Sequence, residues 1–186
     1  MSEPSETIEG PVLQGETQVL VWDRVVRYFH WTVVAGCILN LAVFTDGKGA
    51  HRFIGYIVAL ALIIRVVWGF VGAGHARFDN FVPSRAKLGD YLGALAQGKA
   101  PRFLGHNPAG AVMMLALMAL LAGVSLTGWM LTLDAWFGND GLEELHEGLA
   151  NAILAFAGLH VAAALFESWK HGENLVKSMI TGRKRA

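Results

Sequence analysis

The sequence predicts an all-α membrane protein, built as a bundle of four transmembrane helices with both termini on the same side. Of its 186 residues, 54% are hydrophobic and only 16% are charged, a balance that departs from that of soluble domains. Four apolar stretches also approach the ~20 residues that cross a bilayer as a helix. They lie at about 25–45, 50–72, 108–133 and 146–169. An even number of crossings returns the chain to its starting side.

The polar segments around these spans predict their orientation. Residues 1–21 are expected to form a polar cytoplasmic tail, because Met1–Thr17 is polar and acidic and lacks the basic start of a signal peptide. Basic residues precede the first span, separate the second from the third and follow the fourth: Arg24, Arg27, Arg77, Arg85, Lys87, Lys99, Arg102, Lys170, Lys177, Arg183, Lys184 and Arg185. The connection 134–145 carries acidic residues and no basic ones. The positive-inside rule therefore predicts an N-in, C-in topology.

One folded domain, 22–177, is expected between this tail and a basic C-terminal tail, 178–186. Its long cytoplasmic loop contains Ser84–Gln97, where apolar residues recur at helical spacing: Leu88, Tyr91, Leu92 and Leu95. The pattern predicts a short interfacial helix at the membrane surface. A soluble helix packed on the end of the bundle is the alternative.

Charge and cysteine content exclude several classes of site. Fifteen Lys and Arg balance fifteen Asp and Glu, so no global field favours the binding of nucleic acid. The single cysteine, Cys37, excludes an internal disulfide, a Cys-rich zinc site and an iron–sulfur cluster. The sequence has no C-x-x-C-H motif, so covalently attached haem is excluded as well.

Four histidines lie inside or at the edge of predicted spans, where ionisable residues are functional candidates: His30, His51, His146 and His160. At about 100° and 1.5 Å per residue, His146 and His160 share one helix face and lie ~21 Å apart. The directions of the helices place His51 and His146 near the periplasmic ends, and His30 and His160 nearer the cytoplasm. Depth therefore predicts two pairs, His51 with His146 and His30 with His160.

Zinc, copper and haem all accept imidazole, but two imidazoles alone leave a zinc site two ligands short. Haem supplies four nitrogens of its own and needs only two axial ligands, so the pairs predict two non-covalent b-type haems. Glycines in the spans either let a porphyrin approach the backbone or let helices pack closely: Gly36, Gly55, Gly123, Gly128, Gly148 and Gly158. The sequence leaves both interpretations open.

Arg65 follows His51 by four helical turns and is predicted on the same helix face. There it could pair with a propionate of the cytoplasmic haem, and snorkelling to the headgroups is the alternative. Arg52 could serve the periplasmic haem in the same way. Met113, Met114 and Met118 are expected to fill the core, and His75, His106 and His171 to lie on the solvated surface.

Three segments carry a resemblance to a known family: Trp22–Trp31, His51–Tyr56, and the stretch from Leu145 to Val161 with its two histidines. Together they resemble the bacterial cytochrome b561 family, which is grouped with the b-type cytochrome subunit of nickel–iron hydrogenases. The resemblance runs from about Trp22 to Lys177. It implies a four-helix dihaem cytochrome of the bacterial inner membrane, with axial ligands at His30, His51, His146 and His160.

The resemblance also implies electron transfer between the quinone pool and a periplasmic partner, such as a c-type cytochrome, or a small oxidant or reductant. The segment Gly105–Gly110 resembles members associated with c-type cytochromes, and it also fits an ordinary helix start. Two imidazoles on each iron leave no open site for a substrate, which indicates an electron-transfer protein. Whether it is also an enzyme, as a quinone oxidoreductase, stays open. The acidic residues of 134–144 could dock a basic partner or form a solvated loop.

Two other interpretations compete with this one. The first is a haem-bearing membrane anchor of a larger oxidoreductase, as in hydrogenases. The second is a haem-free four-helix membrane protein with incidental histidines.

Overall fold

Four long helices form the body of the structure, a computed structural model that describes residues 17–186. They are α1 (Arg24–Ala42), α2 (Gly49–Val71), α5 (Pro108–Met130) and α6 (Asp140–His171). Each is long and apolar enough to cross a membrane, which confirms the prediction of four spans. Residues 1–16, most of the expected N-terminal tail, lie outside the described residues.

Polar side chains cap the starts of three of these helices, and Asp23 does so for α1 by accepting a hydrogen bond from the Val26 N–H. The side chains of Asn107 and Asn139 each accept a hydrogen bond from a backbone N–H of the first turn, at 2.7 and 2.9 Å. These bonds satisfy donors that a helix start leaves free. α6 therefore begins at Asp140, earlier than the predicted span, and its acidic first turn favours the positive end of the helix dipole. A search for apolar stretches misses such a polar turn.

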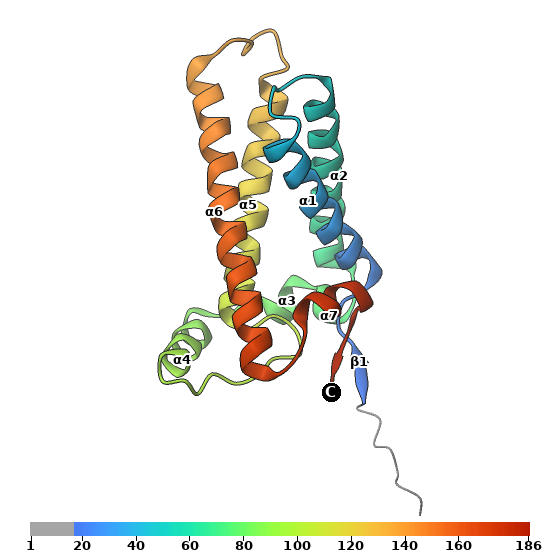
Figure 1. Cartoon of the computed structure of the whole chain (residues 1–186), viewed down its shortest axis with the longest axis vertical. Coiled ribbons are helices and arrows are strands. Elements are labelled where there is room, and N and C mark those ends of the chain that lie inside the picture. Colours follow the sequence, from blue (N-terminus) through green and yellow to red (C-terminus); the bar gives the residue numbers. More distant parts are fainter. Residues whose placement is uncertain (1–16) are drawn as a thin grey trace, which may run out of the picture.

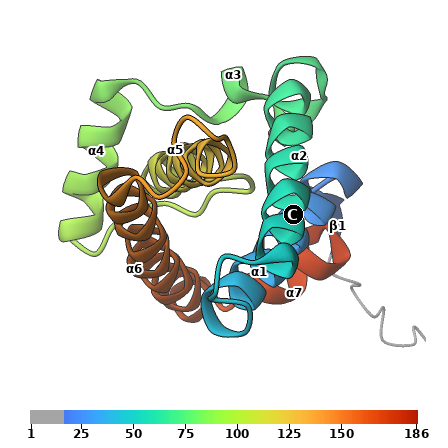
Figure 2. The same cartoon turned by 90° about the horizontal axis from the view of Figure 1, so that it is seen from above.

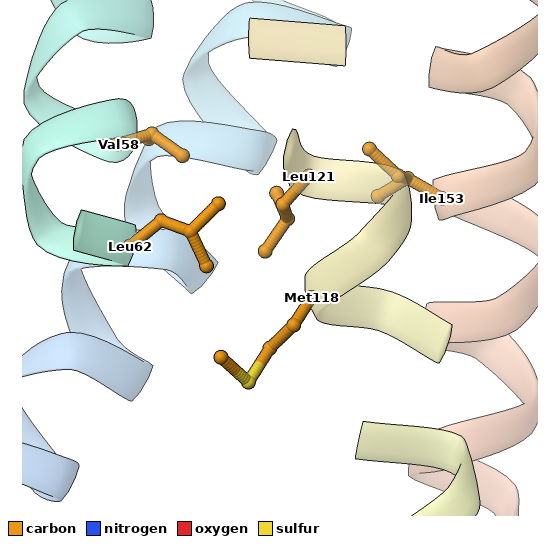
Figure 3. Packing of buried hydrophobic residues seen from close by; sticks show 5 residues of the cluster. All are labelled: Val58, Leu62, Met118, Leu121 and Ile153. Atoms are coloured by element: carbon orange, nitrogen blue, oxygen red, sulfur yellow. The ribbon is translucent and has the colours of Figure 1, made fainter. Parts of the chain in front are cut away.

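The chain forms two antiparallel helix pairs, α1 with α2 and α5 with α6, which are joined by contacts between α2 and α5. Figure 2 shows the four helices around the bundle axis. The core between α2, α5 and α6 contains Val58, Leu62, Met118, Leu121 and Ile153 (Figure 3). Large apolar side chains also cover the outside of the helices, as contact with lipid requires; examples are Phe53, Phe70 and Leu154.

Both described ends of the chain lie at one end of the bundle, which we call the terminus end (Figure 1). There β1 (Gln18–Leu20) pairs antiparallel with β2 (Arg183–Arg185), and Val19 lies opposite Lys184. The opposite end, which we call the loop end, carries the connections 43–48 and 131–139. The two strands thus lie on the same side of the bundle, as an even number of spans predicts.

The residues expected as a basic C-terminal tail belong to this packed end. They form the last part of α7 (Leu175–Thr181) and the strand β2, and both Ser178 and Lys184 are buried. The Trp22 indole donates a hydrogen bond to the Ser178 hydroxyl at 3.3 Å. Sequence patterns do not predict this segment, because a three-residue strand of basic residues has no hydrophobic periodicity.

The connection from α2 to α5 crosses the terminus end through η1 (Gly74–Ala76), α3 (Phe78–Phe81) and α4 (Arg85–Ala96). α4 is the helix predicted at 84–97. Its Tyr91 is buried and donates a hydrogen bond to the Glu167 carboxylate of α6 at 3.4 Å. Burial and this carboxylate raise the pKa of Tyr91 to about 12, so the hydroxyl stays protonated. The contact joins α4 to the end of α6, and the exposed Leu92 leaves an apolar side chain at the surface, as an interfacial helix requires.

Candidate functional site

At the loop end, the structure brings His51 of α2 and His146 of α6 together. Their ring centroids lie 6.2 Å apart, with an angle of 61° between the ring planes. Two imidazoles on opposite sides of one metal ion, each with a nitrogen about 2 Å from it, have ring centres about 6 Å apart. The spacing of this pair is therefore that of two axial ligands of a single iron.

The Nδ1 atoms of both rings are held by hydrogen bonds. His51 Nδ1 donates to the Phe44 carbonyl oxygen at 2.7 Å. The Thr127 hydroxyl donates to the Gly123 carbonyl at 3.0 Å and so accepts from His146 Nδ1 at 2.9 Å. A proton on Nδ1 leaves Nε2 with a free lone pair, which is how partners of this kind prepare histidine for a metal.

A cavity of about 300 Å³ adjoins the pair and is lined by residues of all four long helices. Its walls are mostly apolar, and they include Gly36, Gly55 and Gly128 beside the two histidines. A Cβ atom at Gly128 would lie 3.0 Å from Cε1 of His146, closer than ordinary van der Waals contact. Gly128 is thus the position at which a side chain would push the imidazole aside.

Of the other glycines, two serve close helix packing and two face open space. A Cβ at Gly36 would lie 2.4 Å from Val58 Cγ2, and one at Gly123 would lie 3.2 Å from Leu149 Cδ1. These two positions therefore serve close packing, of α1 on α2 and of α5 on α6. A Cβ at Gly148 or Gly158 would meet nothing within 4 Å, so both face open space.

The residues at the loop end fit a haem held by two imidazoles. The ring spacing is that of two axial ligands, and each Nε2 atom keeps a lone pair for iron. The cavity beside them is apolar, as the porphyrin is. Among residues 17–186, no group of three or more His, Cys, Asp or Glu side chains could hold a metal ion. Two imidazoles are thus the ligand set that this end offers.

At the terminus end, His30 of α1 and His160 of α6 are both half-buried and close enough to interact electrostatically. The His30 ring packs edge-on against Trp31. Its Nδ1 atom is buried and has no hydrogen-bond partner among the described residues. A buried polar atom without a partner is costly, so a further hydrogen-bond partner at His30 Nδ1 would stabilise this position.

Arg65 lies at the same end and is 1% exposed. Both Nη atoms are buried, and neither has a hydrogen-bond partner in the part of the chain that the structure describes. The guanidinium lies 5.3 Å from the centre of the Phe78 ring. Arg65 therefore does not snorkel to the surface. Burying a cation without a hydrogen-bonded partner costs several kcal/mol, and the carboxylate of Asp23 is near enough to offset part of this cost.

Arg52 lies at the loop end, where it is exposed and lines the cavity. Its Nε donates to the Gly47 carbonyl oxygen at 2.9 Å. The side chain thus stabilises the connection between α1 and α2 and also borders the His51 site.

The expectation of solvated surface is wrong for His106. Its ring lies between Trp22 and Phe81, with centroid distances of 4.7 and 5.2 Å, and its Nδ1 is buried without a partner among residues 17–186. His75 packs against Gly105, and Nε2 of His171 lies 3.3 Å from a carboxylate oxygen of Glu167. His106 is enclosed because residues 21–22 fold over the start of α5, a contact between distant segments that spacing does not predict.

Comparison with known proteins identifies the family. The family described as Prokaryotic cytochrome b561 matches residues 21–182. Three similar proteins bear the name "Probable Ni/Fe-hydrogenase B-type cytochrome subunit". The protein of Rhodobacter capsulatus is 24% identical, and the match covers 92% of this chain and 83% of the relative. Those of Rhizobium leguminosarum and Azotobacter vinelandii are 26% and 25% identical, covering 89% and 90% of this chain and 88% of each relative.

No solved structure matches this chain. Four apolar helices, an imidazole pair at the spacing of axial ligands and a family match over residues 21–182 agree with one another. The protein is a multi-pass bacterial membrane protein whose role is electron transfer through b-type haem. The chain belongs to the prokaryotic cytochrome b561 family.

Proposed function

We propose that the protein carries two b-type haems and transfers electrons through them between the quinone pool and a periplasmic redox partner. His51 and His146 are the axial ligands at the loop end, and His30 and His160 are those at the terminus end. The observation that carries the proposal is the 6.2 Å separation of the His51 and His146 rings. Their Nδ1 hydrogen bonds support it, because they leave both Nε2 atoms free.

A haem with two axial imidazoles supplies one-electron chemistry at iron with no open coordination site. The residues of this chain hold and tune the two sites. Phe44 and Thr127 orient the loop-end ligands and raise their basicity through Nδ1. Arg65 provides a buried positive charge for a propionate at the terminus end. Arg52 serves the loop-end haem from the rim of the cavity.

Charge supports an N-in, C-in orientation. Arg24, Arg27 and the basic strand Arg183–Arg185 all lie at the terminus end. The loop end carries Asp134, Asp140, Glu143 and Glu144. By the positive-inside rule, the terminus end faces the cytoplasm and the loop end faces the periplasm. A periplasmic c-type cytochrome with a basic surface would then meet the acidic loop end.

A second candidate function is that of a haem-bearing membrane anchor for a larger oxidoreductase. The names of the relatives favour it, since each is called a hydrogenase B-type cytochrome subunit. Oxidation of quinol by the purified protein alone distinguishes the two functions. A stand-alone protein oxidises quinol and reduces a soluble acceptor, whereas an anchor does so only with its catalytic subunit.

Haem per polypeptide tests the two sites directly. Protein purified in mild detergent is assayed as the pyridine haemochrome, together with the His51→Ala and His160→Ala variants. We expect two b-type haems in the native chain and one in each variant. His171→Ala is the matched control and should keep both, because His171 pairs with Glu167. A native value of zero from haem-replete cells would refute the proposed function.

A further inference from the structure

His51 lies in the first turn of α2, where a helix is least constrained. It is the third residue of the helix, and among the described residues no side chain caps the start at Lys48. Helix ends without a cap fray, because their first backbone N–H groups have no partner within the helix. His146, by contrast, is the seventh residue of α6, and Asn139 caps that helix. A metal ligand at His51 therefore needs support from outside its own helix.

Asn40 of α1 provides support of this kind. Its Nδ2 donates a hydrogen bond to the backbone carbonyl oxygen of His51 at 3.1 Å. The carbonyl oxygen of Phe44, four residues further along the chain, accepts a hydrogen bond from Nδ1 of the same histidine at 2.7 Å. One bond holds the backbone of His51 and the other holds its ring. The end of α1 and the residues that follow it thus fix both parts of this histidine.

The second polar atom of the Asn40 side chain argues against a role in packing alone. Its Oδ1 is buried and has no hydrogen-bond partner among residues 17–186. A buried acceptor without a partner costs free energy, and a leucine of similar size would avoid this cost. Packing of α1 on α2 alone would therefore favour an apolar residue at this position. The bond from Nδ2 to His51 explains why an amide is there.

We propose that Asn40 is a positioning residue for the loop-end haem, because it holds the backbone of His51 at the depth at which the imidazole meets His146. The inference rests on the proposed function, in which these two histidines ligate one iron. Asn40 lines the same cavity as the two ligands, and it acts on the iron only through His51. Ligands of a metal must be held within about 0.5 Å of their productive geometry, so a frayed first turn would weaken the site.

The other ligand of the pair is held in a related way. The Thr127 hydroxyl of α5 bonds Nδ1 of His146 on α6 at 2.9 Å. Each histidine is thus held by the preceding helix of its antiparallel pair, α1 for α2 and α5 for α6. The bond from Asn40 differs in that it holds the backbone, which the capped helix α6 does not require.

The rate at which haem leaves the protein tests this role. The detergent-purified chain and its Asn40→Leu variant are mixed with excess apomyoglobin, which takes up released haem, and the transfer is followed by absorbance. The loss of one such hydrogen bond corresponds to a roughly fivefold change. We therefore expect the loop-end haem to leave the variant roughly five times faster and the terminus-end haem to leave at the native rate. The loop-end haem is identified as the one absent from His51→Ala, and the unchanged haem reports that the variant is folded.

The EPR spectrum of the ferric protein separates positioning from packing. The signal of a haem with two imidazoles depends on the angle between the ring planes, so a loosened His51 should shift or broaden the loop-end signal in Asn40→Leu. Asn151→Leu is the matched control, because it replaces an exposed asparagine of α6 and should keep both native signals and rates. The proposal is overturned if Asn40→Leu keeps the native loop-end signal, or if it loses both haems equally fast. A native chain without haem contradicts the proposed function instead.

Discussion

Replacement of Thr127 by valine removes the hydroxyl that holds His146 while keeping the shape of the side chain. The hydroxyl lies 2.9 Å from His146 Nδ1 and is buried in α5. A hydrogen bond from Nδ1–H makes the imidazole a more basic ligand, and a more basic ligand stabilises ferric iron. Thr127→Val should therefore raise the midpoint potential of the loop-end haem.

The size of this shift follows from the strength of one hydrogen bond. A buried neutral hydrogen bond contributes about 1 kcal/mol net. For a one-electron couple, a tenfold change corresponds to about 59 mV, and about 1.4 kcal/mol is tenfold. The loss of the bond should thus raise one midpoint by roughly 40 mV if it acts on the ferric state alone. The terminus-end haem should not shift, since the histidine bonded to Thr127 is His146 at the loop end.

Potentiometric titration of the purified protein, followed by the haem absorbance, measures both midpoints in one experiment. Thr127→Ser is the matched control, because it keeps the hydroxyl and removes only the methyl group. If the serine variant shifts as far as the valine variant, packing and not the hydrogen bond determines the potential. If the valine variant titrates like the native chain while both haems are retained, the assigned role of Thr127 is refuted.

Two further predictions concern sterics and pH. Gly128→Ala should lower the occupancy of the loop-end haem, because its Cβ would lie 3.0 Å from His146 Cε1. Gly148→Ala is the control, since its Cβ would meet open space and the variant should keep two haems. The pyridine haemochrome assay measures both. Burial raises the pKa of Glu173, but hydrogen bonds from Arg102 and the Arg185 backbone N–H outweigh it, and the net pKa lies below the usual 4.5. The ion pair between Glu173 and Arg102 should therefore stabilise the C-terminal segment by about 1–3 kcal/mol above pH 4.5. This stabilisation should be lost as the pH falls through the lowered pKa of Glu173. Proteolysis at Arg183–Arg185 should become faster over that interval in the native chain, and Glu173→Gln should be cleaved readily at every pH.

The fold could largely be predicted from the sequence because lipid imposes a simple rule. A helix that crosses a bilayer needs an unbroken apolar stretch of about 20 residues, and four such stretches are visible without any knowledge of their contacts. The boundaries were less predictable. α6 begins at Asp140 because Asn139 caps it, and α5 ends at Met130, before the predicted limit at 133. These ends depend on single hydrogen bonds, which hydropathy does not register.

Depth and helix direction were enough to predict that His51 lies beside His146, as the structure shows. The residues that orient them were not predictable in the same way. Thr127 is one hydroxyl in a long apolar helix, and nothing in its spacing marks it as the partner of a residue nineteen positions later. For Arg65 the sequence allowed either a position beside a haem propionate or snorkelling to the headgroups, and its burial in the structure excludes snorkelling. Partners of this kind are set by tertiary contacts, which a periodic pattern does not contain.

The two ends of the bundle hold their histidines by different means. At the loop end, the partners of His51 and His146 are a carbonyl and a hydroxyl, both neutral and both in or beside the long helices. At the terminus end, His30 Nδ1 is buried without a hydrogen-bond partner among residues 17–186. Four apolar helices and the connection at Phe44 therefore supply the partners of the first pair, whereas the described residues supply no such partner to His30 Nδ1.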